Sequence, residues 1–165
     1  FLSFISGRNP HYLIGEQVIA APVVKDLCIE AISTGYILLD GGARSAVEII
    51  SGTQSIPMEK IDVIVSHALA GQYLGMRFIY LESGSGASKS VELPLIQRVS
   101  NKVDTPLIVG GGINSPRMAR KIVGAGASIV VTGSVIEDEP QKMKEYHYLK
   151  SYMKFINQNG MICLN

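Results

Sequence analysis

Short apolar, β-branched runs recur along the chain, and this recurrence limits the possible folds more than any other feature. The runs cover residues 1–6, 34–40, 76–82, 106–112 and 128–134, and each ends in a small or polar residue. Continuous apolar stretches such as Leu107-Ile108-Val109 are typical of strands buried on both faces, as in a parallel sheet. We therefore expect five parallel strands.

Helical patterns fill the gaps between these runs. Asn9-Pro10 and Ser115-Pro116 each place a capping side chain before a proline that suits the first helical turn. Apolar residues at helical spacing predict helices over 61–73 and 141–157, whereas residues 41–60 predict a long loop with a short helix. The alternation of strands and helices favours βαβ units.

The fold class expected from this order is α/β, the C-terminal portion of a (β/α)8 TIM barrel with about five βα units. A complete barrel has eight strands and about 250 residues, whereas this sequence has 165. We expect residues 1–165 to form one partial-barrel domain, equivalent to barrel strands four to eight. A strand-like start without an initiator Met predicts that a longer polypeptide precedes Phe1. A doubly wound sheet is the alternative.

Composition narrows the possible partners and location. The net charge of +1 gives no bias toward nucleic acid, so no nucleic-acid partner is expected. The sequence contains no run of 18 apolar residues that could span a bilayer. Cys28 and Cys163 show no spacing pattern and are interpreted as reduced thiols, which fits a cytoplasmic location.

Three consecutive strands end in glycine-rich turns, which together predict a phosphate site. A phosphate that sits against backbone N–H groups leaves no room for a Cβ atom, and some of the turn residues need φ > 0. At the last two strands of a barrel, such turns form the usual phosphate site. The turns are Glu82-Ser83-Gly84-Ser85-Gly86, Gly110-Gly111-Gly112-Ile113-Asn114 and Thr132-Gly133-Ser134.

Tyr80 and Glu82 end the third strand and point to the same face because they are two residues apart. A buried carboxylate needs a polar partner, and Glu82 could bind the hydroxyls of a polyol phosphate or take a proton from one. Pairing with a buried Arg or Lys is the alternative for Glu82. Asp40, at the end of the second strand, is interpreted either as a cation contact or as a turn cap.

These motifs resemble those of the geranylgeranylglyceryl phosphate synthase family. The resemblance covers residues 1 to about 138, and its most specific part joins the Tyr-x-Glu-x-Gly-Ser-Gly element at residues 80–86 to Gly110-Gly111-Gly112-Ile113 and Thr132-Gly133-Ser134. Ser6-Gly7-Arg8-Asn9-Pro10 also resembles a family segment. The family joins the C3 hydroxyl of sn-glycerol 1-phosphate to geranylgeranyl diphosphate, releases diphosphate with Mg²⁺, and serves archaeal membrane lipid synthesis.

The resemblance implies roles for individual residues. Glu82 and Tyr80 would be catalytic, with Glu82 orienting the glycerol and assisting loss of its proton. Tyr12 matches the aromatic residue that limits the prenyl chain, which implies a C20 donor. The residues expected to bind sn-glycerol 1-phosphate are Tyr80, Leu81, Glu82, Ser83, Gly84, Ser85, Gly86, Gly111, Gly112, Gly133 and Ser134.

The resemblance also limits what can be expected of the chain alone. The family motifs associated with Mg²⁺ and diphosphate have no counterpart in this sequence, so the metal ligands are unknown and we expect the isolated chain to lack synthase activity. Homo-oligomers and a peripheral membrane association are implied. Other hypotheses are an FMN-binding barrel, a sugar-phosphate isomerase and an inactive fragment, since the glycine turns suit any phosphate.

Overall fold

The computed structural model describes residues 1–138 and 140–142 of the 165-residue chain. Five strands alternate with helices along it. The strands are β1 (Leu2–Phe4), β2 (Thr34–Leu38), β3 (Phe78–Glu82), β4 (Leu107–Gly110) and β5 (Ile129–Val131). The helices are α1 (Glu16–Asp26), α2 (Ala46–Ser51), α3 (Ile61–Tyr73), α4 (Leu93–Ser100), α5 (Pro116–Gly124) and α6 (Ser134–Asp138), with a π-helical turn η1 (His11–Gly15) and a 3-10 turn η2 (Pro140–Lys142).

The five strands form one parallel sheet in the order β1-β2-β3-β4-β5. Each strand therefore pairs with the next one along the chain, without the reversal of strand order that defines a doubly wound sheet. This is the arrangement of successive units in a (β/α)8 barrel, so the predicted fold class is confirmed. The assignment of these units to strands four to eight stays a prediction.

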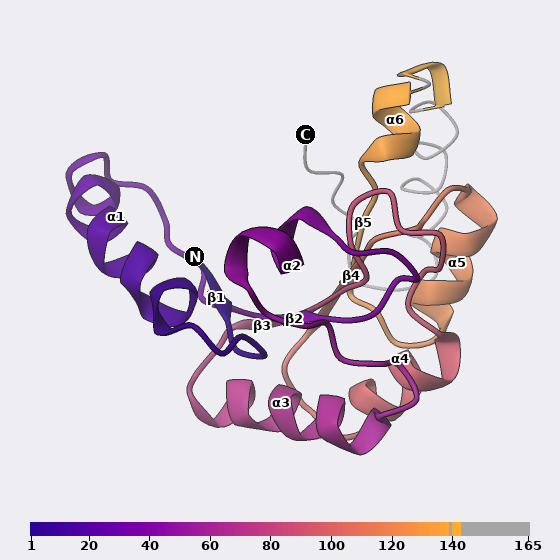
Figure 1. The fold of residues 1–165 in the computed structure, drawn as a ribbon, viewed down its shortest axis with the longest axis horizontal. Helices are drawn as coiled ribbons and strands as arrows, with labels where there is room; N and C mark the ends of the chain where they lie inside the picture. Colours follow the sequence, from indigo (N-terminus) through magenta and orange to yellow (C-terminus); the bar gives the residue numbers. More distant parts are fainter. Residues whose placement is uncertain (139, 143–165) are drawn as a thin grey trace.

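Side chains along each strand point alternately into the helix-covered core and to the opposite face of the sheet. Figure 1 shows α3 and α4 running below the strands, whereas α2 lies above them and α1 extends beyond β1. Ile37, Ile79 and Val109 are fully buried toward the covering helices. The neighbouring residues Tyr36 and Tyr80 point to the other face of the sheet, toward a cavity, and a Cβ on Gly110 would lie on this face too.

The predicted helix starts are found, with one difference. Ser115 Oγ accepts a hydrogen bond from Met118 N at 3.3 Å, as expected of an N-cap. Asn9 Oδ1 likewise accepts from His11 N at 3.0 Å, but the chain continues as the π-helical turn η1 before α1 begins. The helix predicted over residues 141–157 lies largely outside the described residues.

The irregular segment after β2 contains the short helix that the sequence suggested. Ser45 and Glu48 form a capping box, in which the Ser45 hydroxyl accepts from Glu48 N and the Glu48 carboxylate accepts from Ser45 N. Glu48 also accepts from both the backbone and the hydroxyl of Ser55. Burial is the largest single influence on the pKa of Glu48 and by itself would raise it. The charge-assisted bonds from Ser55 and Ser45 together outweigh burial, so the pKa of Glu48 is lowered. The α2 segment is therefore fixed at both ends.

Candidate active site

The three glycine-rich turns meet at the carboxyl edge of the sheet. A Cβ on Gly111 would lie 2.7 Å from Glu82 Oε1 and 2.8 Å from Gly84 N, so the turn after β4 touches the turn after β3. Ser85 Oγ lies 3.5 Å from Ser134 Oγ, which joins the turn after β3 to the start of α6. The prediction that these turns come together is confirmed.

Several N–H groups in these turns have no protein acceptor. Within the described part of the chain, the backbone N–H groups of Gly86, Gly112 and Gly133 donate to no protein oxygen. Gly86 and Gly112 have φ values of +68° and +64°. A residue with a side chain would be strained in this left-handed conformation. These glycines line one cavity together with Ser85 and Ser134, and unpaired N–H groups beside two serine hydroxyls are suited to bind a phosphate group.

Glu82 and Tyr80 lie beside these turns and contact each other. Glu82 is 8% exposed, Glu82 Oε1 accepts from Gly84 N at 2.8 Å, and the Tyr80 hydroxyl donates to the Glu82 carboxylate. Among the described residues, no Arg or Lys forms an ion pair with Glu82. The buried carboxylate is thus held by hydrogen bonds, and the alternative of a structural ion pair is not found.

Burial sets the protonation behaviour of this pair. Removal from water raises the pKa of Glu82, and the hydrogen bonds from Tyr80 and Gly84 oppose that rise only in part. Burial also raises the pKa of Tyr80, and the nearby Glu82 carboxylate adds to the effect. A carboxylate with a raised pKa is a stronger base than an ordinary one, so Glu82, beside the neutral phenol of Tyr80, is suited to accept a proton from a hydroxyl of a bound molecule.

Gly110 makes room for this pair, although the sequence analysis gave it no role of its own. A Cβ at Gly110 would lie 2.5 Å from both Glu82 Oε2 and Tyr80 Oη, closer than a real Cβ can approach. The register pairs Gly110 with Glu82 on β3, so only glycine leaves room for the Tyr80–Glu82 hydrogen bond at this position.

A row of aromatic residues crosses the cavity face below Glu82. Phe4, Tyr36 and Tyr80 are register partners on three adjacent strands, with ring centroids 5.4 and 5.3 Å apart and nearly perpendicular planes. Burial, with a contribution from the Glu82 carboxylate, raises the pKa of Tyr36, so its hydroxyl stays neutral. Phe4 and Tyr36 were missed in the sequence analysis, since their alignment depends on strand register.

One cavity of about 830 Å³ contains these features. Its polar end is formed by the glycine-rich turns, its middle by Tyr36, Tyr80 and Glu82, and its apolar end by Leu2, Phe4, Tyr12 and Val47. The strand order places the polar end at β3 to β5 and the apolar end at β1. The cavity can therefore hold a phosphorylated molecule at one end and a hydrocarbon chain at the other.

Most residues of the predicted set line this cavity, but three do not. Tyr12, Tyr80, Glu82, Ser85, Gly86, Gly111, Gly112, Gly133 and Ser134 line it. Leu81 is fully buried in the helix-covered core, and the Ser83 hydroxyl donates to Gly110 O. Gly84 is turned against Ser45. These three residues support the turn, and only their backbone atoms could contact a ligand.

The remaining polar residues of the described part of the chain are engaged in local contacts and do not bring a set of metal ligands together. Asp40 Oδ1 accepts from Gly42 N at 2.8 Å, which is the turn-capping interpretation of this residue. Among the described residues, no group of three His, Cys, Asp or Glu side chains could hold a metal ion. No helix in this part of the chain is long and apolar enough to cross a membrane.

Comparison with known proteins agrees with the geometry. The family model described as the PcrB family matches residues 1–151. The chain belongs to the PcrB family. Similar curated proteins include the geranylgeranylglyceryl phosphate synthases of Chitinophaga pinensis, 48% identical over 145 residues, and Sulfolobus acidocaldarius, 42% identical over 159 residues. These alignments cover 88% and 95% of this chain but 58% and 61% of the two relatives.

Solved structures of PcrB-family relatives have the same fold. Wild-type GGGPS from Thermoplasma volcanium matches with a TM-score of 0.79 and 34% sequence identity, over 90% of this chain and 57% of that one. The (S)-3-O-geranylgeranylglyceryl phosphate synthase from Thermoplasma acidophilum, solved with its substrate sn-glycerol-1-phosphate, matches with a TM-score of 0.80 and 34% identity, over 90% and 58%. The chain thus spans about three-fifths of the length of these relatives.

Proposed function

We propose that this chain is part of a prenyltransferase, a geranylgeranylglyceryl phosphate synthase, and that it supplies the binding site for sn-glycerol 1-phosphate. The observation that carries the proposal is a single cavity that joins anion-suited glycine turns, a buried carboxylate–phenol pair and an apolar end. Relatives with this name, one of them solved with sn-glycerol-1-phosphate, support the same assignment.

The phosphate group would occupy the polar end. The N–H groups of Gly86, Gly112 and Gly133 and the hydroxyls of Ser85 and Ser134 would donate to its oxygens, as backbone concavities do for other phosphates. The glycerol hydroxyls would then extend toward Glu82 and Tyr80. This orientation presents the C3 hydroxyl to the middle of the cavity.

The chemistry follows from the pair in the middle. The C3 oxygen attacks the first carbon of the allylic diphosphate, a new C–O bond forms, and the bond from that carbon to the diphosphate oxygen breaks. The diphosphate leaves with the bonding electron pair. Glu82 takes the proton of the hydroxyl, and its raised pKa makes the carboxylate a stronger base than an ordinary exposed carboxylate. Tyr80 keeps the carboxylate in place, so that the nucleophile and base are prealigned.

The prenyl chain would occupy the apolar end. Phe4, Tyr36 and Tyr12 line the path from Glu82 toward β1, and the half-buried Tyr12 side chain closes one side of it. We propose a C20 chain, because the resemblance places Tyr12 at the length-limiting position. Val47 of α2 also lines this apolar end of the cavity.

Mg²⁺ belongs to the proposed reaction, where it would neutralise charge on the diphosphate. The described residues bring no three ligands together, and Asp40 is engaged in its turn. They do not form a site for the ion, and no step is assigned through it.

Binding by the full chain tests this function without requiring turnover. We expect titration calorimetry to detect sn-glycerol 1-phosphate, with weaker binding of its sn-3-phosphate enantiomer and of flavin mononucleotide. Glu82→Ala should retain affinity for inorganic phosphate and lose the preference between enantiomers, because the glycines bind phosphate and Glu82 binds hydroxyls. Tighter binding of flavin mononucleotide than of glycerol 1-phosphate would overturn the proposal.

A further inference from the structure

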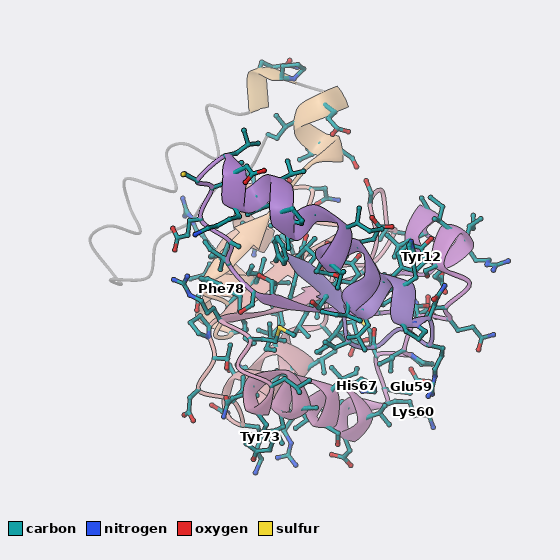
Figure 2. The ribbon with its side chains drawn as sticks, turned by 90° about the vertical axis from the view of Figure 1, so that its left-hand side faces the viewer. Tyr12, Glu59, Lys60, His67, Tyr73 and Phe78 are labelled. Carbon is teal, nitrogen blue, oxygen red and sulfur yellow. The ribbon has the colours of Figure 1, made fainter. Side chains whose placement is uncertain are left out.

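Tyr12 lies at the apolar end of the cavity on an unusual piece of backbone. It belongs to the π-helical turn η1, which connects β1 to α1, and its half-buried side chain lines the cavity. Figure 2 places Tyr12 far from His67 and Tyr73, which both belong to α3. π-helical turns are rare in proteins, and those that occur are often found at functional sites.

Two contacts hold the Tyr12 side chain, and neither comes from the cavity wall. The His11 ring lies edge-to-face against the Tyr12 ring, with centroids 5.0 Å apart and planes at 78°. The Tyr12 hydroxyl donates to the carbonyl of Ile50 at 3.4 Å, which connects η1 to α2 across 38 residues. The ring and the hydroxyl are thus held by different elements.

His11 itself is fixed in place although its side chain is exposed. The π-helical turn brings Glu16 N–H onto the carbonyl of His11, and this stacks the two residues on one side of the turn. His11 Nε2 consequently lies 2.5 Å from a Glu16 carboxylate oxygen. A Cβ at Gly15 would lie 3.0 Å from His11 Nδ1, so glycine at this position leaves room for the ring.

His11 does not line the cavity, and no metal-binding cluster exists among the described residues in which it could take part. An exposed contact of this kind contributes little to stability, so the contact between His11 and Glu16 does not by itself account for the arrangement. The turn, the glycine and the Glu16 contact are all compatible with the edge-to-face orientation of the His11 ring against Tyr12.

We propose that His11 is a positioning residue for Tyr12, and that His11 and the Ile50 carbonyl together determine how long a prenyl chain the cavity accepts. This inference rests on the proposed function. A Tyr12 ring that is held from both ends forms a fixed wall, whereas a ring released from either contact can rotate away and let a longer chain pass. His11 acts through Tyr12 and touches no substrate.

The test measures how the full chain binds unreactive prenyl thiolodiphosphates with 15, 20 and 25 carbons. His11→Ala should raise the affinity for the C25 analogue relative to C20 by about threefold to tenfold, the range that corresponds to one aromatic contact. His11→Phe keeps a ring against Tyr12 and should restore most of the parent's ratio. Tyr12→Phe loses only the bond to Ile50 and should shift the ratio in the same direction as His11→Ala.

Matched control variants distinguish an effect on the position of the Tyr12 ring from a general loss of stability. His67→Ala and Tyr73→Phe make the same chemical changes on α3, away from the cavity, and should leave the ratio unchanged. Affinity for sn-glycerol 1-phosphate should stay constant in the variants at His11, His67 and Tyr73, because its proposed site lies at the opposite end of the cavity.

The outcomes are distinguishable. An unchanged C25-to-C20 ratio in both His11→Ala and Tyr12→Phe overturns the inference, while normal prenyl binding by the parent leaves the proposed function standing. The same ratio in His11→Phe and His11→Ala also overturns it, since the ring contact would then be irrelevant. A parent chain that binds glycerol 1-phosphate but none of the three prenyl analogues overturns the inference together with the proposed prenyl site.

Discussion

Gly110→Ala is the substitution that most directly tests the geometry around Glu82. Gly110 is not in the left-handed region of φ, so its backbone accepts alanine, and the only obstacle is the new methyl group. That methyl would lie 2.5 Å from both Glu82 Oε2 and Tyr80 Oη. A normal contact needs roughly another ångström, so at least one of the two side chains must move.

The size of the effect follows from the crowding. Inserting one methyl group into a packed site costs about 1–3 kcal/mol. If that cost falls on the arrangement that binds glycerol, affinity for sn-glycerol 1-phosphate falls by about 5- to 150-fold. Affinity for inorganic phosphate should change far less, because Gly112 and Gly133 are not displaced. In a complete enzyme, misplacement of the base by about 1 Å would lower the rate by about 100-fold.

Titration calorimetry with both ligands measures this difference, and thermal unfolding monitors the fold. Gly124→Ala is the matched control, since a Cβ there meets no atom within 4 Å and alanine favours the helix by up to about 1 kcal/mol. If the affinity of Gly110→Ala for glycerol 1-phosphate equals that of the parent chain and of Gly124→Ala, the Tyr80–Glu82 pair does not bind the glycerol and the reasoning is refuted.

Three further predictions concern Glu82, the serines of the glycine-rich turns and the cap of α2. Glu82 has a raised pKa in the folded chain, so the unfolded state loses its proton first. The stability contributed by the protonated Glu82 is therefore present below the ordinary carboxyl pKa and is lost as pH rises above it. Glu82→Gln should remove this decline, as measured by thermal unfolding across a series of pH values, and an unchanged pH profile would contradict the burial argument. Ser85→Ala and Ser134→Ala should each weaken binding of glycerol 1-phosphate by about tenfold in calorimetry, the worth of one hydrogen bond to a charged group; unchanged binding in both would remove these hydroxyls from the site. Ser45→Ala should destabilise α2 by about 1 kcal/mol, because the N-terminal cap of the helix is lost. Hydrogen exchange should then show faster exchange of the amides of α2 only. Uniformly faster exchange throughout the chain would contradict this prediction and mean that the cap stabilises the whole fold.

Local patterns in the sequence were enough to predict the strands, one helix start and the shared face of two site residues. Continuous apolar runs such as residues 107–109 indicated buried strands, and Ser115-Pro116 fixed the start of α5. The spacing of Tyr80 and Glu82 placed both on one face, because side chains alternate along any strand. The repetition of glycine turns at strand ends also predicted their meeting point, since parallel strands end at the same edge.

Features that depend on strand register or on contacts between distant segments could not be predicted from local patterns and follow from the folded structure. Phe4, Tyr36 and Tyr80 form one aromatic row only because their strands pair at that register. The need for glycine at position 110 arises from side chains on a neighbouring strand, and the bond from Tyr12 to Ile50 joins segments that no local pattern connects. Leu81 and Ser83 show the converse: they lie within the motif, but alternation turns their side chains away from the cavity. A motif therefore identifies the strand end, and pairing with the neighbouring strands determines which of its atoms can reach a ligand.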